Sequence, residues 1–312
     1  MILRRAATAL TSAGCALLVT LALTPPAVDG GHMPPEPPRL PTTATSPPVS
    51  PPVSPSSSPA APTFSRSRLT QALDRYLRDR PGALSISVRD LSTGLSYTYN
   101  RELRTATASI VKVNIVIALL LQAQRGHRGL TAAERDLAAR AIKVSDNDAA
   151  SALWYRIGGA PGLAAANRKL GLRATTPGPG GAWGATTTTA ADQVRLLNTL
   201  ASRKSPLTPK NRRYVLSLMS RVAPEQSWGI TAAADPKART AVKNGWLPRP
   251  SQNNLWTLTS IGRVRNDRHD LLIAVISERH PSYGTGVKTI EHVTRTVTQS
   301  LTQPLPRPDR LS

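Results

Sequence analysis

A long segment that cannot form a hydrophobic core divides this chain and restricts folding to the residues on its C-terminal side. Residues 25 to 63 hold half of the chain's 28 prolines, including the repeat PPVSPPVSP, and few large apolar side chains. Such segments favour extended polyproline II at about 3.1 Å per residue, which gives a reach on the order of 100 Å. We therefore predict a disordered linker over 25–63 and a folded domain over 64–312. A spacer without a selected length would have the same composition.

The N-terminal segment 1–24 predicts export. Arg4 and Arg5 precede an apolar run from Ala6 to Leu23, which is typical of a signal peptide. The run is also long enough to span a bilayer, and no clean cleavage site follows it. A removed signal peptide and an N-terminal membrane anchor both remain open. In either case we expect the protein to be secreted, or anchored to the extracellular face of the cell membrane or cell wall.

The few residues suited to metal or cofactor chemistry are scattered. Cys15 is the only cysteine, so the exported domain has neither a disulfide nor a cysteine-ligated metal. As a lipoprotein acceptor, Cys15 is disfavoured by Ser12 in the place of a leucine and by the apolar run that continues past it. We predict no metal and no cofactor, and we expect linker or surface positions for the histidines His32, His127, His269, His280 and His292.

The net charge of +22 first suggests nucleic acid as a partner, because basic proteins neutralise phosphates. Export argues against that partner, and we predict no nucleic-acid binding. Anionic cell-wall polymers would account for the charge, and so would a merely solvated arginine-rich surface. The domain is expected to be a monomer.

The pattern after residue 64 predicts an α/β fold of the α+β type. A helix is expected in 65–82, followed by two alternating strands, ALSISVRD and LSYTYN. Helical segments continue to about residue 222, and one of them begins with a capping box of Thr131 and Glu134. Three strands follow, at ARTAVKNGW, NLWTLTSIGRV and DLLIAVISE, before a last helix. This order implies a five-stranded antiparallel sheet, flanked by the N- and C-terminal helices, with an inserted all-helical lobe.

A lysine interrupts the most hydrophobic predicted helix, residues 104 to 124. Lys112 stands one turn after Ser109, so both side chains share a helix face and the amine could accept the hydroxyl proton. Burial among apolar neighbours lowers the pKa of a lysine and leaves part of it as a free base. The alternative is a structural lysine whose amine reaches the solvent at the end of a helix.

Two further motifs support the catalytic interpretation. Ser145-Asp146-Asn147 falls where one predicted helix gives way to another, and Lys243-Asn244-Gly245 falls on a predicted strand. Together with Ser109-x-x-Lys112, in this order, they resemble the active-site motifs of the serine beta-lactamase and penicillin-binding protein superfamily, especially class A beta-lactamases. The resemblance extends over residues 66 to 301.

The resemblance implies a role for each matched residue. Ser109 would be the nucleophile, Lys112 its general base, and Ser145 a relay of the proton to the leaving nitrogen. Asn147 would orient Lys112 and hold a substrate amide, while Lys243 would attract the substrate carboxylate.

The strand that carries the third motif would complete the site. The backbone N–H groups of Ser109 and of Trp246, the residue directly after Gly245, would form the oxyanion hole. Asn244 stands where the family most often has Thr or Ser, and we expect its amide to keep a hydrogen-bond donor for the substrate carboxylate.

The sequence departs from class A beta-lactamases at the omega loop. That family uses a Glu there to activate the water that releases the acyl-enzyme. This chain has no Asp or Glu between Asp148 and Asp192, and its loop reads RATTPGPGGAWGATTTT. Slow deacylation is therefore expected, with Glu225 and Glu278 as the nearest glutamates in sequence to the third motif.

The expected activity is an acyl-serine reaction on beta-lactams or on peptidoglycan peptides with D-amino acids. A penicillin-binding or D,D-peptidase-like wall protein is the alternative, followed by a non-catalytic wall-associated module. Ser-His-Asp chemistry has no support, because no Gly-x-Ser-x-Gly motif occurs.

Overall fold

The domain is built around one antiparallel sheet. The computed structural model describes residues 64–302, so the N-terminal segment 1–24 with Cys15, the linker 25–63 with His32, and residues 303–312 lie outside it. The sheet order is β2-β1-β7-β6-β5. The strands are β1 (Ala83–Asp90), β2 (Ser96–Tyr99), β5 (Arg239–Arg249), β6 (Leu255–Arg265) and β7 (Asp270–His280). The predicted five-stranded antiparallel sheet is confirmed.

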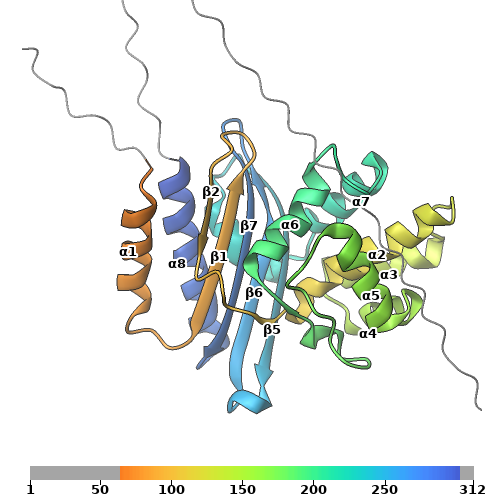
Figure 1. The fold of residues 1–312 in the computed structure, drawn as a ribbon, viewed down its shortest axis with the longest axis horizontal. Helices are drawn as coiled ribbons and strands as arrows, with labels where there is room; N and C mark the ends of the chain where they lie inside the picture. Colours follow the sequence, from red (N-terminus) through yellow and green to blue (C-terminus); the bar gives the residue numbers. More distant parts are fainter. Residues whose placement is uncertain (1–63, 303–312) are drawn as a thin grey trace, which may run out of the picture. The chain divides into compact units, whose positions relative to one another are not determined.

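Both faces of the sheet are covered, and the central strand β7 shows why. Leu271, Ile273 and Val275 pack with α1 (Arg66–Leu77) and α8 (Tyr283–Thr302), which lie together on one face. The alternate residues of the same strand, Leu272, Ala274 and Ile276, pack with the helical lobe on the other face (Figure 1). A strand buried on both faces reads as a continuous apolar run, as DLLIAVISE does.

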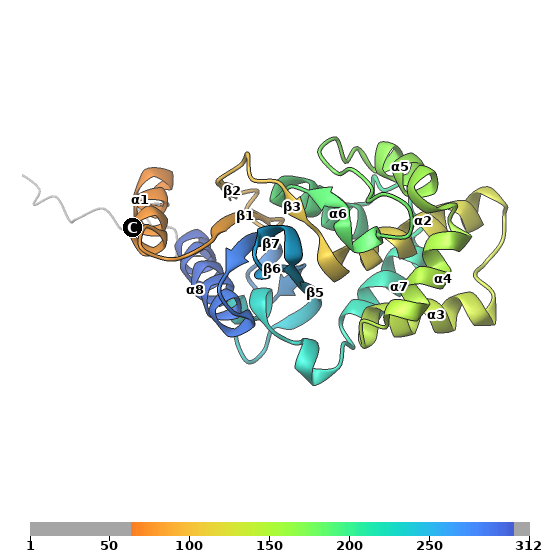
Figure 2. The ribbon, with the colours of Figure 1, turned by 90° about the horizontal axis from the view of Figure 1, so that it is seen from below.

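The helical lobe surrounds α2 (Val111–Arg125), of which nearly every side chain is buried. The other helices of the lobe are α3 (Ala132–Lys143), α4 (Asn147–Arg156), α5 (Gly159–Leu170), α6 (Ala190–Ala201) and α7 (Pro209–Met219). Figure 2 shows them gathered on the side of the sheet opposite α1 and α8. Residues 108–125 are apolar enough for a membrane span, but 78% of that window is buried in the lobe, as in the core helix of a soluble domain.

Local sequence signals place the helix ends. Thr131 accepts from the backbone N–H of Glu134, and the Glu134 carboxylate accepts from the N–H of Thr131, which confirms the capping box. Gly171 ends α5 in the left-handed conformation with φ of 70°.

The prediction of one helix over residues 104–124 was wrong in its first part. Thr105–Ala106 form a short strand, β3, which pairs with β4 (Thr187–Thr188). A 3₁₀ turn, Ala108–Ile110, precedes α2. Ala108 has a φ of 47°, which an α-helix cannot accommodate, so the regular helix starts only at Val111.

The histidine prediction was also wrong at one position. His280 is 1% exposed, and its ring lies against Gly82, where an added Cβ would be 3.1 Å from two ring atoms. Neither ring nitrogen has a hydrogen-bond partner among the described residues, and burial lowers the pKa of the ring.

Candidate active site

Lys112 is fully buried, and one short segment, residues 145–147, accepts its hydrogen bonds. Its Nζ donates to the backbone oxygen of Ser145 at 2.6 Å, to Oγ of Ser145 at 3.2 Å and to Oδ1 of Asn147 at 2.8 Å. The side chain has no exposed surface, and burial lowers its pKa to about 8. Lys112 therefore does not reach solvent as a structural lysine at a helix end would.

Ser145 lies between two lysine amines. Its Oγ accepts from Nζ of Lys243 at 3.0 Å as well as from Lys112. Lys243 is 1% exposed, and its pKa is held well below the usual range by burial and by the positive charge of Lys112. Ser145 itself has a φ of 57°, a strained conformation that costs about 1–3 kcal/mol and is typical of functional sites.

The start of α4 fixes the second motif. Oδ1 of Asp146 accepts from the backbone N–H of Ala149 and caps the helix, while Arg140 holds the other carboxylate oxygen at 2.8 Å. The helix thus begins at Asn147, which directs its side chain at Lys112. Within this motif Asp146 is structural, and Ser145 and Asn147 face the lysine.

Close backbone approach joins Ser109 to the third motif. A Cβ added to Gly245 would lie 2.5 Å from the backbone nitrogen of Ser109 and 2.9 Å from the carbonyl oxygen of Thr107, so only glycine fits. Oγ1 of Thr259, on the neighbouring strand β6, donates to that carbonyl at 2.9 Å. The edge strand β5 therefore lies directly against the turn that carries Ser109.

Asn244 does not fit the expected contact with a substrate carboxylate. It is fully buried, and its Nδ2 donates to the carbonyls of Gln226 at 2.8 Å and Trp228 at 3.1 Å. Both amide hydrogens are used by the protein itself. The expectation fails because the pleat of β5 turns this side chain into the domain, where an amide finds two backbone acceptors.

A groove of about 400 Å³ opens over Ser109. Asn147 and Trp246 line it, together with the segment 181–185 of the loop between α5 and α6. Ser109 is partly exposed there, whereas Lys112, Ser145 and Lys243 form a hydrogen-bonded group that is not part of the groove lining. The structure thus brings the three motifs together around one opening.

Trp183 is a component of the site that the motifs did not reveal. The Nζ of Lys112 lies 4.8 Å from the centre of its ring, and the indole N–H donates to Oγ of Ser151 at 3.1 Å. The ring adds a cation–π contact and shields the amine from water. A lone tryptophan in the Gly-rich loop was the only available signal.

No acidic residue lines this groove within residues 64–302. Asp192 accepts from the backbone N–H of Ala174 and from Oγ1 of Thr175, so it anchors the start of the loop. Glu278 accepts from Oγ1 of Thr105, and Glu225 is exposed on a 3₁₀ turn. These three acids are thus engaged or positioned elsewhere.

Several solved structures share this fold. The structure of a PBP-A mutant in its acyl-enzyme complex with penicillin G is 20% identical, has a TM-score of 0.66, and covers 77% of this chain and 99% of that chain. A class A beta-lactamase from Bacteroides cellulosilyticus is 16% identical with a TM-score of 0.67, covering 78% of this chain and all of the other. At these identities the likeness shows the fold, which is that of class A beta-lactamases.

Sequence comparison establishes the family. A protein from Mycobacterium tuberculosis that is named as a lipoprotein, LppW, is 28% identical over 240 residues, which is 74% of each chain. The model of the beta-lactamase enzyme family matches residues 68–133 and 129–301, and so spans most of the domain that contains Ser109, Lys112 and Lys243. The chain therefore belongs to the beta-lactamase enzyme family.

Proposed function

We propose that this protein is an exported serine hydrolase that forms an acyl-serine on beta-lactams or related D-amino-acid peptides and releases the acyl group slowly. The observation that carries the proposal is the sharing of Oγ of Ser145 between Lys243 and Lys112, the lysine that follows Ser109 by three residues. A purely structural role would give no reason to bury two amines around one hydroxyl. Burying a charge is costly unless it is paired or used.

The first step would be acylation of Ser109. Neutral Lys112 takes the proton of the Ser109 hydroxyl as Oγ attacks the carbonyl carbon. The negative charge that forms on the carbonyl oxygen is met by the backbone N–H groups of Ser109 and Trp246. The proton then passes from Lys112 through Ser145 to the leaving nitrogen, the C–N bond breaks, and an ester remains on Ser109.

Substrate recognition would depend on Lys243 and Asn147. A carboxylate near Lys243 would raise the pKa of that lysine and favour its charged form, which a bound anion needs. Asn147 is exposed at the groove, and its amide nitrogen is available to a substrate carbonyl while Oδ1 holds Lys112. Asn244 has no part in this proposal.

A D,D-peptidase-like or penicillin-binding role is the second candidate. It is favoured by the lining of the groove, which contains no acid among the described residues. Efficient beta-lactam hydrolysis requires a group that activates the deacylating water, whereas a long-lived acyl-enzyme does not. The PBP-A mutant whose structure resembles this fold was captured as an acyl-enzyme with penicillin G.

Intact-mass analysis after incubation with penicillin G tests the proposal. We expect one added penicillin mass per chain, and its loss in Ser109→Ala, because Ser109 is the one hydroxyl residue among the described residues that line the groove. Ser282→Ala, on an exposed turn, is the matched control and should label normally. Labelling that persists in Ser109→Ala would refute the assignment of the nucleophile. Release of D-alanine from an acyl-D-Ala-D-Ala peptide would favour the peptidase role.

A further inference from the structure

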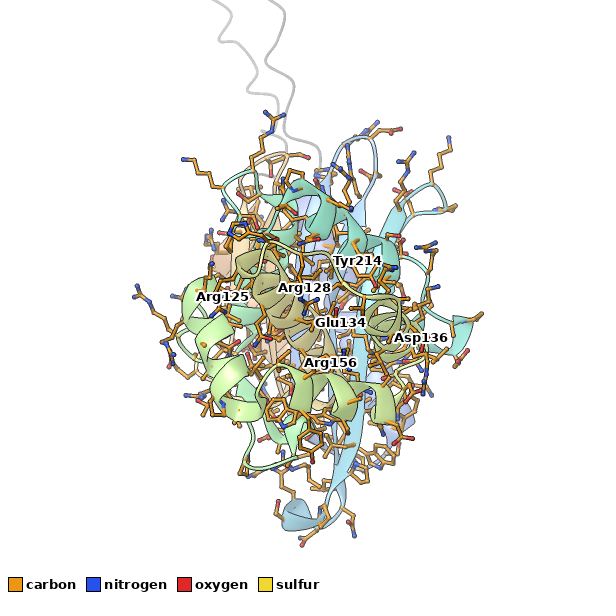
Figure 3. The ribbon with its side chains drawn as sticks, turned by 90° about the vertical axis from the view of Figure 1, so that its right-hand side faces the viewer. Arg125, Arg128, Glu134, Asp136, Arg156 and Tyr214 are labelled. Atoms are coloured by element: carbon orange, nitrogen blue, oxygen red, sulfur yellow. The ribbon has the colours of Figure 1, made fainter. Side chains whose placement is uncertain are left out.

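A second cavity lies in the helical lobe, away from the groove over Ser109. It has a volume of about 720 Å³ and lies between the C-terminal half of α2, the start of α3 and α7. Small-molecule sites commonly have volumes of about 300–1,000 Å³. Figure 3 looks onto this part of the lobe, where Arg128 and Tyr214 border the cavity. Its size is that of a ligand site rather than a packing defect.

Hydrogen bonds within the protein hold the walls of this cavity in place. The side chain of Gln124 donates to the carbonyl of Pro206 at 3.0 Å and accepts from the backbone N–H of Thr208 at 3.0 Å. The hydroxyl of Tyr214 donates to the carbonyl of Arg135 at 3.3 Å. These contacts tie α7 to α2 and α3, so the cavity is formed before any ligand binds.

The lining combines an apolar wall with an excess of positive charge. Leu120, Leu130 and the ring of Tyr214 supply the apolar part. The charged residues that line the cavity are all cationic: Arg128, Arg135, Lys210 and Arg213. No described residue of the lining carries a carboxylate. A pocket of this kind favours a ligand with a negative charge at one end and an apolar body at the other.

One of these cations is already neutralised by the protein. Arg128 donates to both oxygens of the buried Glu134, at 2.8 and 3.0 Å, and Arg156 lies 3.6 Å from the same carboxylate. Figure 3 shows Glu134 with these two arginines. Arg135, Lys210 and Arg213 form no ion pair with any carboxylate in residues 64–302. All three side chains are exposed, so within residues 64–302 their charge is accessible to a ligand.

We propose that this cavity binds a small amphipathic anion, a carboxylate or phosphate monoester on a short apolar chain. The anionic group would lie between Arg135, Lys210 and Arg213, and the chain against Leu120 and Leu130. The site is separate from the candidate active site. Gln124, in its lining, follows Ser109 by 15 residues, which is a distance of about 20 Å along the helix. The proposal is therefore independent of the proposed hydrolase activity.

Calorimetric titration of the full chain tests this site with octanoate and octyl phosphate as the probes. Octyl glucoside, which keeps the chain but lacks the charge, and acetate, which keeps the charge but lacks the chain, are the controls. We expect one molecule of anionic probe per protein and no binding of either control. Preference for one probe would identify the head group, carboxylate or phosphate, and supports the proposal.

Substitutions locate the binding. The double variant Lys210→Gln with Arg213→Gln should weaken binding about tenfold or more, since hydrogen bonds to a charged group are the strong ones. The matched pair Arg75→Gln with Lys288→Gln, on α1 and α8, should leave it unchanged. Gly129→Phe offers a variant that keeps both charges, because a Cβ there meets no heavy atom within 4 Å and the ring can occupy the cavity.

The outcomes separate cleanly. Loss of binding in Gly129→Phe, with an unaltered circular dichroism spectrum, supports the cavity as the site. Binding of octyl glucoside as tight as that of octanoate would overturn the role of the cations. Equal binding by the double variant, by its matched control and by the unsubstituted protein would overturn the location of the site. A failure of both anionic probes to bind at millimolar concentration would overturn the proposal itself.

Discussion

At the candidate active site, two lysine amines and one hydroxyl form a chain in which protons can be exchanged. A charged Lys112 has three N–H donors, and all three are used, on the carbonyl and Oγ of Ser145 and on Asn147. To act as a base it must first lose one proton. The lowered pKa of Lys112 makes that loss possible near neutral pH, and Trp183 helps to keep the site dry.

The pH dependence of acylation follows from this pKa. Burial favours the neutral amine and lowers the pKa of Lys112 to about 8, so about a tenth of it is neutral at pH 7. The acylation rate should rise about tenfold per pH unit below 8 and level off above it. Stopped-flow measurement with a chromogenic cephalosporin checks the profile. Lys112→Arg, which keeps its charge at every pH, should acylate at no pH, and a flat profile in the unsubstituted protein would exclude Lys112 as the base.

Gly245 permits a prediction about positioning. A methyl group at this position would lie 2.5 Å from the nitrogen of Ser109, which is backbone and cannot rotate away. Gly245→Ala should separate β5 from the nucleophile turn and lower the acylation rate about 10²-fold by misaligning the oxyanion hole. We expect only about 1–3 kcal/mol of lost stability from the local overpacking.

Gly284→Ala is the matched control for that variant. An added Cβ there meets no heavy atom within 4 Å, and the residue lies in the first turn of α8. Its acylation rate and thermal midpoint should stay near those of the unsubstituted protein. An equal acylation rate in both variants would show that the close approach of β5 to Ser109 has no catalytic role.

At the scale of elements, the sequence predicted those strands and helices in which apolar residues recur at a regular spacing. The five strands of the sheet and the long helices follow from alternation and helical spacing, and β1 spans the residues ALSISVRD as expected. The strands β3 and β4 have only two residues each, which is too short to show an alternating pattern. For that reason the sequence did not reveal the strand and turn before α2. The inward direction of Asn244 depends on how β5 lies against the segment 226–228, a contact between residues distant in sequence that no local pattern contains.

The loop between α5 and α6 determines the expected kinetics. Its residues 181–185 line the groove and contain no acid, whereas general-base assistance is worth about 10²–10⁴ in rate. We expect a burst of one product equivalent per enzyme, followed by slow turnover, with the acylated mass persisting for minutes or longer. Turnover at tens per second without a burst would contradict this account.

Two variants of the same loop refine that test. Ala182 and Ala185 are exposed and line the groove, so a longer side chain has room at either position. Deacylation should accelerate in Ala182→Glu or Ala185→Glu only if the loop directs the carboxylate at the ester. The glutamine substitutions at the same positions match the size without supplying a base, and they separate general-base assistance from a change in loop packing.

At the scale of the whole molecule, a strongly basic domain follows a segment that resembles an export signal. The net charge of +22 and the 39-residue linker predict a domain held at an anionic wall, and the relative LppW is named as a lipoprotein. If residues 1–24 are retained as an anchor, two attachments are expected, one through this segment and one through surface charge. The two differ in their response to salt, because the Debye length falls from about 10 Å at 0.1 M to about 3 Å at 1 M.

That difference gives the last prediction. If residues 1–24 are an anchor, the full chain should fractionate with the envelope and stay there in 1 M salt, because apolar insertion is insensitive to screening. Purified protein lacking residues 1–24 should bind isolated cell walls at low salt and be released at high salt. If it remains in solution at low salt, the arginine-rich surface is only solvated, and the wall polymer is not a ligand. Recovery of the full chain from the cytoplasm would remove the argument against nucleic-acid binding, because the basic surface would then be exposed to RNA and DNA.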